Sequence, residues 1–205
     1  MPGRAWLANG GALGQKTGSE TMPSPAVNNV KILTIALLTL SLDQLTKWIV
    51  VQNLPFNGKP VVVVDGFFEL VHFGNTGAAW SLFSGQNFWL AIFSLAALIF
   101  LWVSRRHFGA ETALGQVALG LILGGVVGNL IDRVVHHHVV DFLQFYIPFQ
   151  FPAFNVADSG ICTGVGLMFV QSFQKPKPGA TWAKKGKVPP EAHALVAPDE
   201  EESEA

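Results

Sequence analysis

The sequence predicts a membrane protein of the all-α class, with four transmembrane helices, a small extracytoplasmic β-ribbon and a short interfacial helix. Three observations predict this class. Hydrophobic residues make up 50% of the 205 residues and charged residues only 13%, and the mean hydropathy of +0.38 is too high for an ordinary soluble domain. Apolar runs of membrane-spanning length recur along the chain. Between the first two runs, β-branched and aromatic residues gather.

The apolar runs cover residues 30–51, 87–104, 112–131 and 154–173. Each is close to the about 17 to 25 residues that a tilted helix needs to cross a bilayer. An even number of crossings places both termini on the same side of the membrane.

Lysine and arginine residues predict which side that is. Outside the runs they gather in the N-terminal segment, the connection 105–111 and the C-terminal tail, as Arg4, Lys16, Arg105, Arg106, Lys175, Lys177, Lys184, Lys185 and Lys187, and Lys31 lies at the boundary of the first run. The other two connections contribute Lys59 and Arg133. The positive-inside rule therefore predicts that both termini and the connection 105–111 are cytoplasmic, and that the first and third connections face outward.

The two ends of the chain differ in composition from its centre. Residues 1–28 are rich in Gly, Ser, Pro and Ala and lack an apolar core of signal-peptide length, which predicts a disordered cytoplasmic extension. Residues 29–174 form the predicted transmembrane domain. Residues 175–205, which include an acidic run, are predicted to be a disordered cytoplasmic tail.

The first outer connection carries two signals. Residues 61–71 are β-branched and aromatic around an Asp65-Gly66 turn, which predicts an extended ribbon on the membrane surface. Residues 76–83 are rich in small and aromatic residues and predict a short amphipathic helix or a loop at the interface.

Glycines recur at four-residue spacing in the third and fourth runs, at Gly120, Gly124, Gly128, Gly160 and Gly164. Such spacing lets helix backbones approach closely and favours a compact bundle. Glycine without a packing role, as is common in membrane helices, is an equally good interpretation.

In the predicted orientation the polar residues near the membrane converge on its outer face. They are Asp43, Lys47, Asn75, Asn129, Asp132, Arg133, Asp141, Asn155 and Asp158. A charged Asp costs about 2.5 to 3.5 kcal/mol on membrane-insertion scales, so several of them in one chain indicate a function. Polar residues that only cap helices would be scattered over both faces.

Asp141 and Asp158 each lie at the edge of an apolar run. Two aspartates brought together without metal ligands indicate a pair that shares a proton, the arrangement by which carboxylates activate water for peptide hydrolysis. The pair predicts an intramembrane aspartyl protease. Asn155 is a good helix N-cap, which places Asp158 in the first helical turn, and a pure capping role for Asp158 is the alternative.

The remaining polar residues are predicted to support this pair. Asp43 and Lys47 are spaced for an i,i+4 ion pair with a structural or substrate-pocket role. Arg133 is placed to neutralise Asp132 or to hold a substrate carbonyl. For Asp132, an interfacial salt bridge without a catalytic part stays open.

Neither the histidines nor the cysteine predicts a metal site. The consecutive residues 136–138 are all histidine, but neighbouring residues cannot easily aim three rings at one ion, and the sequence contains no His-Glu-x-x-His pattern. The single cysteine, Cys162, excludes a disulfide within the chain and is predicted to be a small packed apolar residue. Because it lies inside the fourth run, it is no lipidation signal.

Five segments, in this order, resemble the lipoprotein signal peptidases, the type II signal peptidases of the bacterial inner membrane. They are Asp43-Gln44-Leu45-Thr46-Lys47, residues 75–81 (NTGAAWS), residues 128–133 (GNLIDR), Val139-Val140-Asp141-Phe142 and residues 151–158 (FPAFNVAD). The resemblance extends along most of residues 30–173.

The resemblance implies an aspartyl endopeptidase that removes signal peptides from diacylglyceryl-modified prolipoproteins, cutting before the lipidated cysteine. It implies Asp141 and Asp158 as the catalytic pair, at the periplasmic face, with the other seven polar residues binding substrate or supporting the pair. Prolipoproteins and membrane lipid are the implied partners, with no cofactor, metal or nucleic acid. One departure is Gly74, where the family commonly has Arg before the substrate-contacting Asn, here Asn75.

Two other classes of function compete with a protease. A proton-coupled carrier or channel subunit would relay protons through its acids, but a relay distributes acids through the depth of the membrane, and the inner half of each run has none. A noncatalytic scaffold would use the acids to anchor a partner. Such a scaffold should tolerate Asn in place of Asp141 or Asp158.

Overall fold

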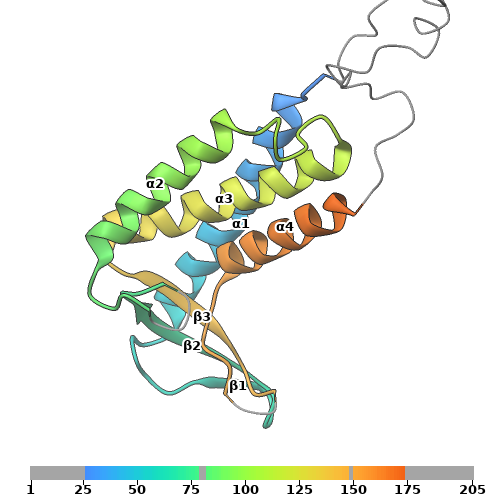
Figure 1. Ribbon diagram of the computed structural model, residues 1–205. Helices are drawn as coiled ribbons and strands as arrows, with labels where there is room; N and C mark the ends of the chain where they lie inside the picture. The colour runs from blue at the N-terminus through green and yellow to red at the C-terminus, as the bar shows by residue number, and fades with distance from the viewer. Residues whose placement is uncertain (1–25, 79–81, 148–149, 174–205) are drawn as a thin grey trace, which may run out of the picture.

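The computed structural model describes residues 26–78, 82–147 and 150–173. In this part of the chain the elements run, in order, α1 (Asn29–Asn53), β1 (Val61–Val64), β2 (Phe68–Asn75), α2 (Asn87–Val103), α3 (Ala113–Val135), β3 (Val139–Phe145) and α4 (Val156–Ser172). The helices form one bundle, and the strands extend from one end of it (Figure 1). The predicted tail 175–205 and all but the last three residues of the predicted extension 1–28 lie outside the described residues.

Each of the predicted apolar runs is helical, with ends that differ from the prediction by a few residues. The starts of two helices follow from local capping, because the side chain of Asn28 accepts from Lys31 N at 2.9 Å and that of Thr112 accepts from Gly115 N at 2.9 Å. Among the described residues, α1 and α3 are long and apolar enough to cross a membrane, and α2 is a shorter apolar helix.

Glycines in α3 allow close contact with the helices on either side of it. A Cβ atom on Gly128 would collide with the carboxylate of Asp43 in α1, and one on Gly164 of α4 would lie 2.7 Å from the carbonyl oxygen of Ala118 in α3. Neither position leaves room for a side chain, which confirms the packing interpretation of the glycine spacing.

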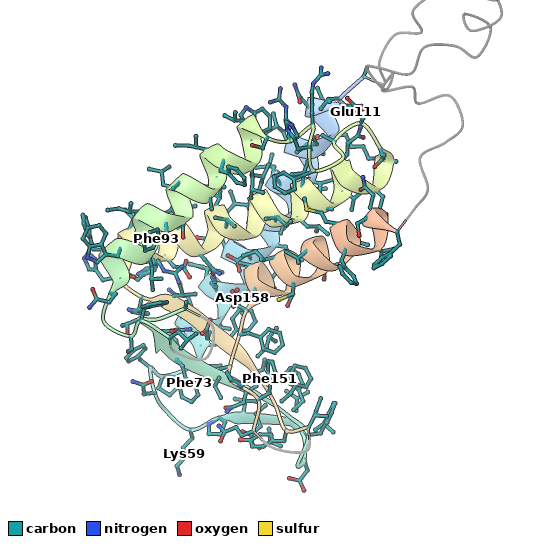
Figure 2. The ribbon with its side chains drawn as sticks, viewed as in Figure 1. Lys59, Phe73, Phe93, Glu111, Phe151 and Asp158 are labelled. Atoms are coloured by element: carbon teal, nitrogen blue, oxygen red, sulfur yellow. The ribbon has the colours of Figure 1, made fainter. Side chains whose placement is uncertain are left out.

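The outward faces of the helices are apolar. None of the side chains of α2 is buried, and Phe93 on this helix, labelled in Figure 2, is 64% exposed. The buried apolar core is correspondingly small and includes Ile32, Leu119 and Leu123. An apolar exterior around a small core is what a bundle immersed in lipid requires.

The sheet has three antiparallel strands in the order β1-β2-β3. The predicted ribbon over residues 61–71 is confirmed as the β1–β2 hairpin, with Gly66 at a positive φ of 66° in its turn. The all-α prediction was wrong about residues 139–145, which we expected to be only an outer connection. They form β3, in which Val139 pairs with Asn75 and Asp141 with Phe73. This pairing joins distant parts of the chain, so no local turn signal announces it.

The interfacial helix predicted over residues 76–83 is not found in the described part of that segment. Residues 77–78 form a bend and residues 82–83 a turn, residue 76 has no regular structure, and residues 79–81 lie outside the described residues. Phe83 has a positive φ of 59°, which a helix does not accommodate.

Candidate active site

Asp141 and Asp158 come from different elements and are joined by one side chain. Asp141 lies within β3, and Asp158 lies in the first turn of α4. The Nδ2 atom of Asn155 donates to Oδ1 of Asp141 at 2.8 Å, and Oδ1 of Asn155 accepts from Asp158 N at 2.9 Å. Asn155 is fully buried. The fold therefore brings together the two aspartates that the sequence analysis paired.

The first turn of α4 explains how Asp158 is held. Asn155 is the N-cap, and the backbone N of Asn155 donates in return to Oδ2 of Asp158 at 3.2 Å, which completes a capping box. The capping prediction for Asn155 is confirmed. Oδ1 of Asp158 is left for a second donor, Nδ2 of Asn129 in α3, at 2.8 Å.

Asp141 is held by two amides and is buried. Besides Asn155, Nδ2 of Asn75 donates to its Oδ2 at 3.0 Å, and Oδ1 of Asn75 accepts from Gly77 N at 2.8 Å, which fixes the direction of the Asn75 amide. Burial and the neighbouring Asp158 carboxylate raise the pKa of Asp141 to about 7, although the two amide hydrogen bonds and the charge of Lys47 act to lower it. Asp141 therefore retains a proton at a pH where an ordinary Asp is ionised.

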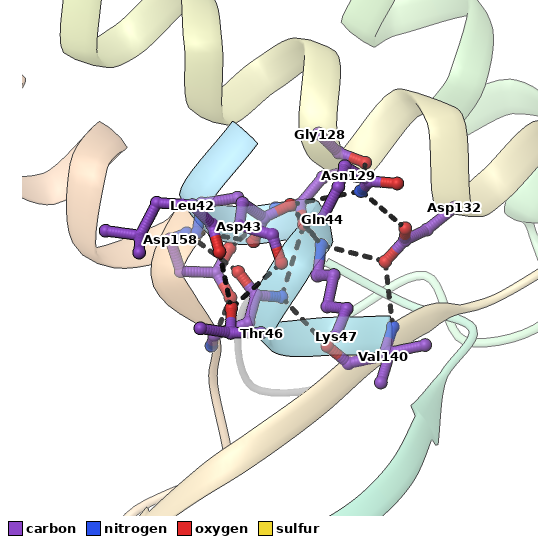
Figure 3. A network of polar contacts seen from close by, with 12 residues as sticks. Leu42, Asp43, Gln44, Thr46, Lys47, Gly128, Asn129, Asp132, Val140 and Asp158 are labelled. Atoms are coloured by element: carbon purple, nitrogen blue, oxygen red, sulfur yellow. Dashed lines mark hydrogen bonds and ion pairs between the residues drawn. The ribbon is translucent and has the colours of Figure 1, made fainter. Parts of the chain in front are cut away.

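A buried ion network lies next to the pair (Figure 3). Nζ of Lys47 is 2.9 Å from Oδ2 of Asp43 and 2.8 Å from Oδ2 of Asp132. The predicted i,i+4 pair of Asp43 and Lys47 is confirmed. Asp132 forms its salt bridge with Lys47. Of the two roles predicted for Arg133, the described residues therefore show no ion pair with Asp132, and the role of holding a substrate carbonyl stays a prediction.

Arg133 is buried and holds backbone carbonyl groups. Its NH1 donates to Asn129 O at 3.2 Å and its NH2 to Gly77 O at 3.1 Å. Its Nε is buried and has no hydrogen-bond partner among the described residues. Arg133 thereby ties α3 to the segment that follows β2.

Gln44 belongs to the site and was not among the predicted site residues. Its Nε2 lies 3.1 Å from Oδ1 of Asp132 and 3.3 Å from Gly128 O. The available signal was its place between Asp43 and Lys47 in the first of the five segments.

A cavity of about 840 Å³ opens beside the two aspartates. Its polar lining residues include Asn75, Asn129, Arg133, Asp141, Asp158 and Ser159, and its apolar ones include Phe73, Val139, Phe151, Phe154 and Ile161. Cys162 also lines the cavity and is exposed, so the prediction of a packed residue was wrong. The cavity combines a polar floor with walls suited to an apolar ligand.

Gly74 shows what replaces the Arg that the resemblance led us to expect. A Cβ atom there would lie 2.8 Å from Cδ2 of His138 and 2.9 Å from Cζ of Phe56. The rings of Phe56 and His138 are themselves 5.5 Å apart. Two aromatic rings thus occupy the space into which a side chain at position 74 would extend.

In the described part of the chain, no group of three His, Cys, Asp or Glu residues could hold a metal ion.

The fold and the site are those of a membrane enzyme. A solved bacterial membrane enzyme, determined by the in meso method at 2.3 Å resolution, superposes with a TM-score of 0.65 and 28% identity, covering 82% of this chain and 99% of that one. A second, at 1.9 Å resolution, gives a TM-score of 0.64 and 29% identity over 76% of this chain and 100% of that one.

The chain belongs to the signal peptidase II family, whose model, described as "Signal peptidase (SPase) II", matches residues 35–174. The lipoprotein signal peptidase of Bacillus subtilis (strain 168) is 43% identical over 139 residues, which are 67% of this chain and 89% of that protein. Those of Bacillus pumilus (strain SAFR-032) and Listeria monocytogenes serotype 4b (strain CLIP80459) are 41% and 40% identical, over 67% and 68% of this chain and 88% and 90% of the relatives. The family resemblance is confirmed, and the chain is a protease.

Proposed function

We propose that this protein is an intramembrane aspartyl endopeptidase that removes signal peptides from diacylglyceryl-modified prolipoproteins and cuts just before the lipidated cysteine. The observation that carries the proposal is the pair Asp141 and Asp158, which are linked by Asn155. Both aspartates line a cavity that is large enough for a peptide segment. Membership of the signal peptidase II family supports the substrate class.

The chemistry follows from a pair that holds one proton. The ionised carboxylate takes a proton from water, and the oxygen of that water attacks the scissile carbonyl carbon while the protonated partner donates its proton to the carbonyl oxygen. The resulting tetrahedral diol collapses when the peptide C–N bond breaks and the leaving nitrogen takes up a proton from the pair. The raised pKa of Asp141 supports a singly protonated pair near neutral pH.

The other polar residues have separate roles in this proposal. Asn75 and Arg133 line the cavity beside the pair and bind the substrate backbone, and the free Nε of Arg133 is the donor for a substrate carbonyl. Asn129 and Asn155 orient the two carboxyl groups. Asp43, Lys47 and Asp132 support the site from behind. No cofactor takes part in these steps.

We place the site at the periplasmic face of the bacterial inner membrane. In this topology all four helices cross the bilayer, residues 29–174 form the peptidase domain, and the extensions 1–28 and 175–205 are cytoplasmic. The arrangement of the bundle supports it, because Asp158 and Glu111 of the basic connection 105–111 lie at opposite ends of the helices (Figure 2). A lipid-anchored substrate then presents its cleavage segment sideways, with its acyl chains still in the bilayer.

A proton relay is supported less well. The acids of the described helices, Asp43, Asp132 and Asp158, gather around the same few amides at one end of the bundle. A relay needs titratable groups spread along its path through the membrane.

The test is cleavage of a purified diacylglyceryl-modified prolipoprotein by the purified protein in detergent, with EDTA present. Mass spectrometry of the product should place the cut before the modified cysteine. The same precursor without its diacylglyceryl group is the matched control and should be cut poorly. The proposal fails if the purified protein leaves the lipid-modified precursor intact.

A further inference from the structure

The backbone amides that directly precede the two paired aspartates are held in the same way. Val140 N, one residue before Asp141, donates to Oδ2 of Asp132 at 3.1 Å. Ala157 N, one residue before Asp158, donates to Oδ1 of Asp43 at 2.9 Å. A carboxylate on α3 thus fixes the strand that carries Asp141, and a carboxylate on α1 fixes the helix that carries Asp158.

Lys47 joins these two carboxylates to each other. Its ammonium group has three N–H donors, and three acceptors surround it: Asp43 at 2.9 Å, Asp132 at 2.8 Å and Oδ1 of Asn129 at 3.0 Å. Asp43, Lys47 and Asp132 are 0%, 3% and 2% exposed. The ammonium is therefore fully used inside the protein, and Figure 3 shows it between its partners.

The third of these contacts determines how Asn129 is oriented. Because Oδ1 of Asn129 faces the ammonium of Lys47, its Nδ2 is turned toward Asp158, to which it donates at 2.8 Å. The opposite orientation would place an NH₂ group against an ammonium and an oxygen against a carboxylate. Lys47 thus selects the amide orientation that supports Asp158.

We propose that Lys47 is a positioning residue that, with Asp43 and Asp132, sets the relative placement of Asp141 and Asp158 for peptide hydrolysis. This inference rests on the proposed function. None of the three residues lines the cavity, so they act on the reaction through other residues and do not bind the substrate.

Lys47 also influences Asp141 through its charge. The charged groups that face Asp141 are Asp158 from α4, Lys47 from α1 and Arg133 from α3, with the neutral amides of Asn75 and Asn155. Burial is the largest influence and raises the pKa of Asp141, whereas the charge of Lys47 lowers it. Removal of this charge should therefore shift the pH profile of cleavage toward higher pH. If Lys47 had only a structural role, its removal would not shift the profile.

The first experiment compares Lys47→Met with Lys59→Met, a matched removal of an exposed lysine on the outer connection. We expect Lys47→Met to lower kcat by about 100-fold, as a small misplacement of reacting groups does. KM should stay close to that of the unmodified protein, and the pH optimum should rise. Lys59→Met should leave all three unchanged.

A second variant covers the case in which Lys47→Met does not fold. Lys47→Met combined with Asp132→Asn removes one cation and one anion, so the net charge of the group does not change. The parent has two carboxylates and one ammonium, and the variant has one carboxylate. Tryptophan fluorescence during heating in detergent reports whether it folds. We expect a folded protein with low kcat and a raised pH optimum.

The inference is overturned if a folded variant without Lys47 has the kcat and pH profile of the parent, or if both variants fail to fold, because the group then serves the fold at large. A failure of the proposed function gives a different result: the parent does not cleave the lipid-modified precursor, or Asp141→Asn cleaves it normally.

Discussion

Asn129 donates from Nδ2 to Oδ1 of Asp158 over 2.8 Å, and this bond connects α3 to the first turn of α4. Oδ1 of the same Asn129 accepts from Nδ2 of Asn155 at 3.2 Å, and Asn155 in turn donates to Asp141. Two asparagine amides thus separate the two carboxyl groups from the buried ion network. Such amides fix geometry without adding charge, so the carboxyl pair can change its protonation while its surroundings stay in place.

Replacement of either paired aspartate by asparagine should abolish turnover. Asn keeps the shape of the side chain but can neither accept a proton from water nor donate one as an acid, so Asp141→Asn and Asp158→Asn should each lower kcat by several orders of magnitude. Yield and membrane insertion should be nearly unchanged. Cleavage assays on protein whose mass confirms that the Asn is intact provide the measurement. Appreciable activity in either variant would rule out the pair.

Loss of the Asn155 side chain should affect both stability and catalysis. Asn155→Ala removes an N-cap, which costs about 0.5 to 2 kcal/mol, and also removes the donor to Asp141. The matched control is Asn28→Ala, which removes the N-cap of α1, outside the cavity lining. Thermal unfolding should detect both changes, and only Asn155→Ala should lower kcat. Equal activity in the two variants would show that Asn155 acts only as a helix N-cap.

Activity should fall as pH rises above about 7. Asp141 has a pKa raised to about 7, so at higher pH the pair loses the proton that polarises the scissile carbonyl. The pH profile of kcat, measured with the lipid-modified precursor in detergent, should show this alkaline limb. A profile that stays flat well above pH 7 would contradict the assignment.

Stability should also depend on pH through Asp141. Its folded-state pKa of about 7 lies above the ordinary Asp pKa of 3.8, so between these values the folded state binds more protons than the unfolded state. The contribution of Asp141 to the free energy of unfolding is full below the pKa that Asp141 has in the unfolded state. It is lost as pH rises through the pKa that Asp141 has in the folded state. The midpoint of thermal unfolding should therefore fall from pH 5 to pH 8, and Asp141→Asn should reduce that fall. An equal fall of the unfolding midpoint in both proteins would show that titratable groups other than Asp141 cause it.

A side chain at position 74 should destabilise the protein. Gly74→Ala places a Cβ atom 2.8 Å from His138 and 2.9 Å from Phe56, and overpacking of this kind costs about 1 to 3 kcal/mol. Combining it with Phe56→Ala should recover part of the loss. Gly166→Ala is the matched control, because nothing lies within 4 Å of a Cβ atom there. Thermal unfolding of the variants in detergent tests this. Equal stability of the two Ala variants would contradict the crowding.

Cysteine accessibility tests the topology. In a Cys162→Ser background, His137→Cys lies in the third connection and His107→Cys in the second. A thiol reagent that cannot cross membranes, applied to intact cells, should label the first and spare the second. The reverse labelling would place the aspartate pair on the cytoplasmic side.

The helices and the local contacts of the site could be predicted from the sequence because their signals are local. Apolar runs mark the helices, the spacing of Asp43 and Lys47 marks an ion pair, and Asn155 three residues before Asp158 marks a cap. Contacts between distant segments could not be predicted this way. The pairing of β3 with β2 has no turn between the strands to announce it.

Side-chain direction was the second source of error. Spacing along α3 places Asp132 next to Arg133, but neighbouring residues on a helix point about 100° apart, and Asp132 faces Lys47 on α1 instead. Cys162 was misjudged because apolar residues occur on every side of α4, so no single apolar face marks the side that packs. In such a helix, sequence alone does not separate a face toward lipid or a cavity from a face toward another helix.

The capping box of α4 has a consequence for how this enzyme responds to heat. Asn155 and Asp158 close the first turn of the helix with the same side chains that hold and supply the carboxyl pair. Helix ends open far more readily than whole domains do. When this one turn frays, the two carboxyl groups separate although the bundle remains assembled. Inactivation on brief heating should therefore set in below the temperature at which the helices unfold, and it should reverse on cooling.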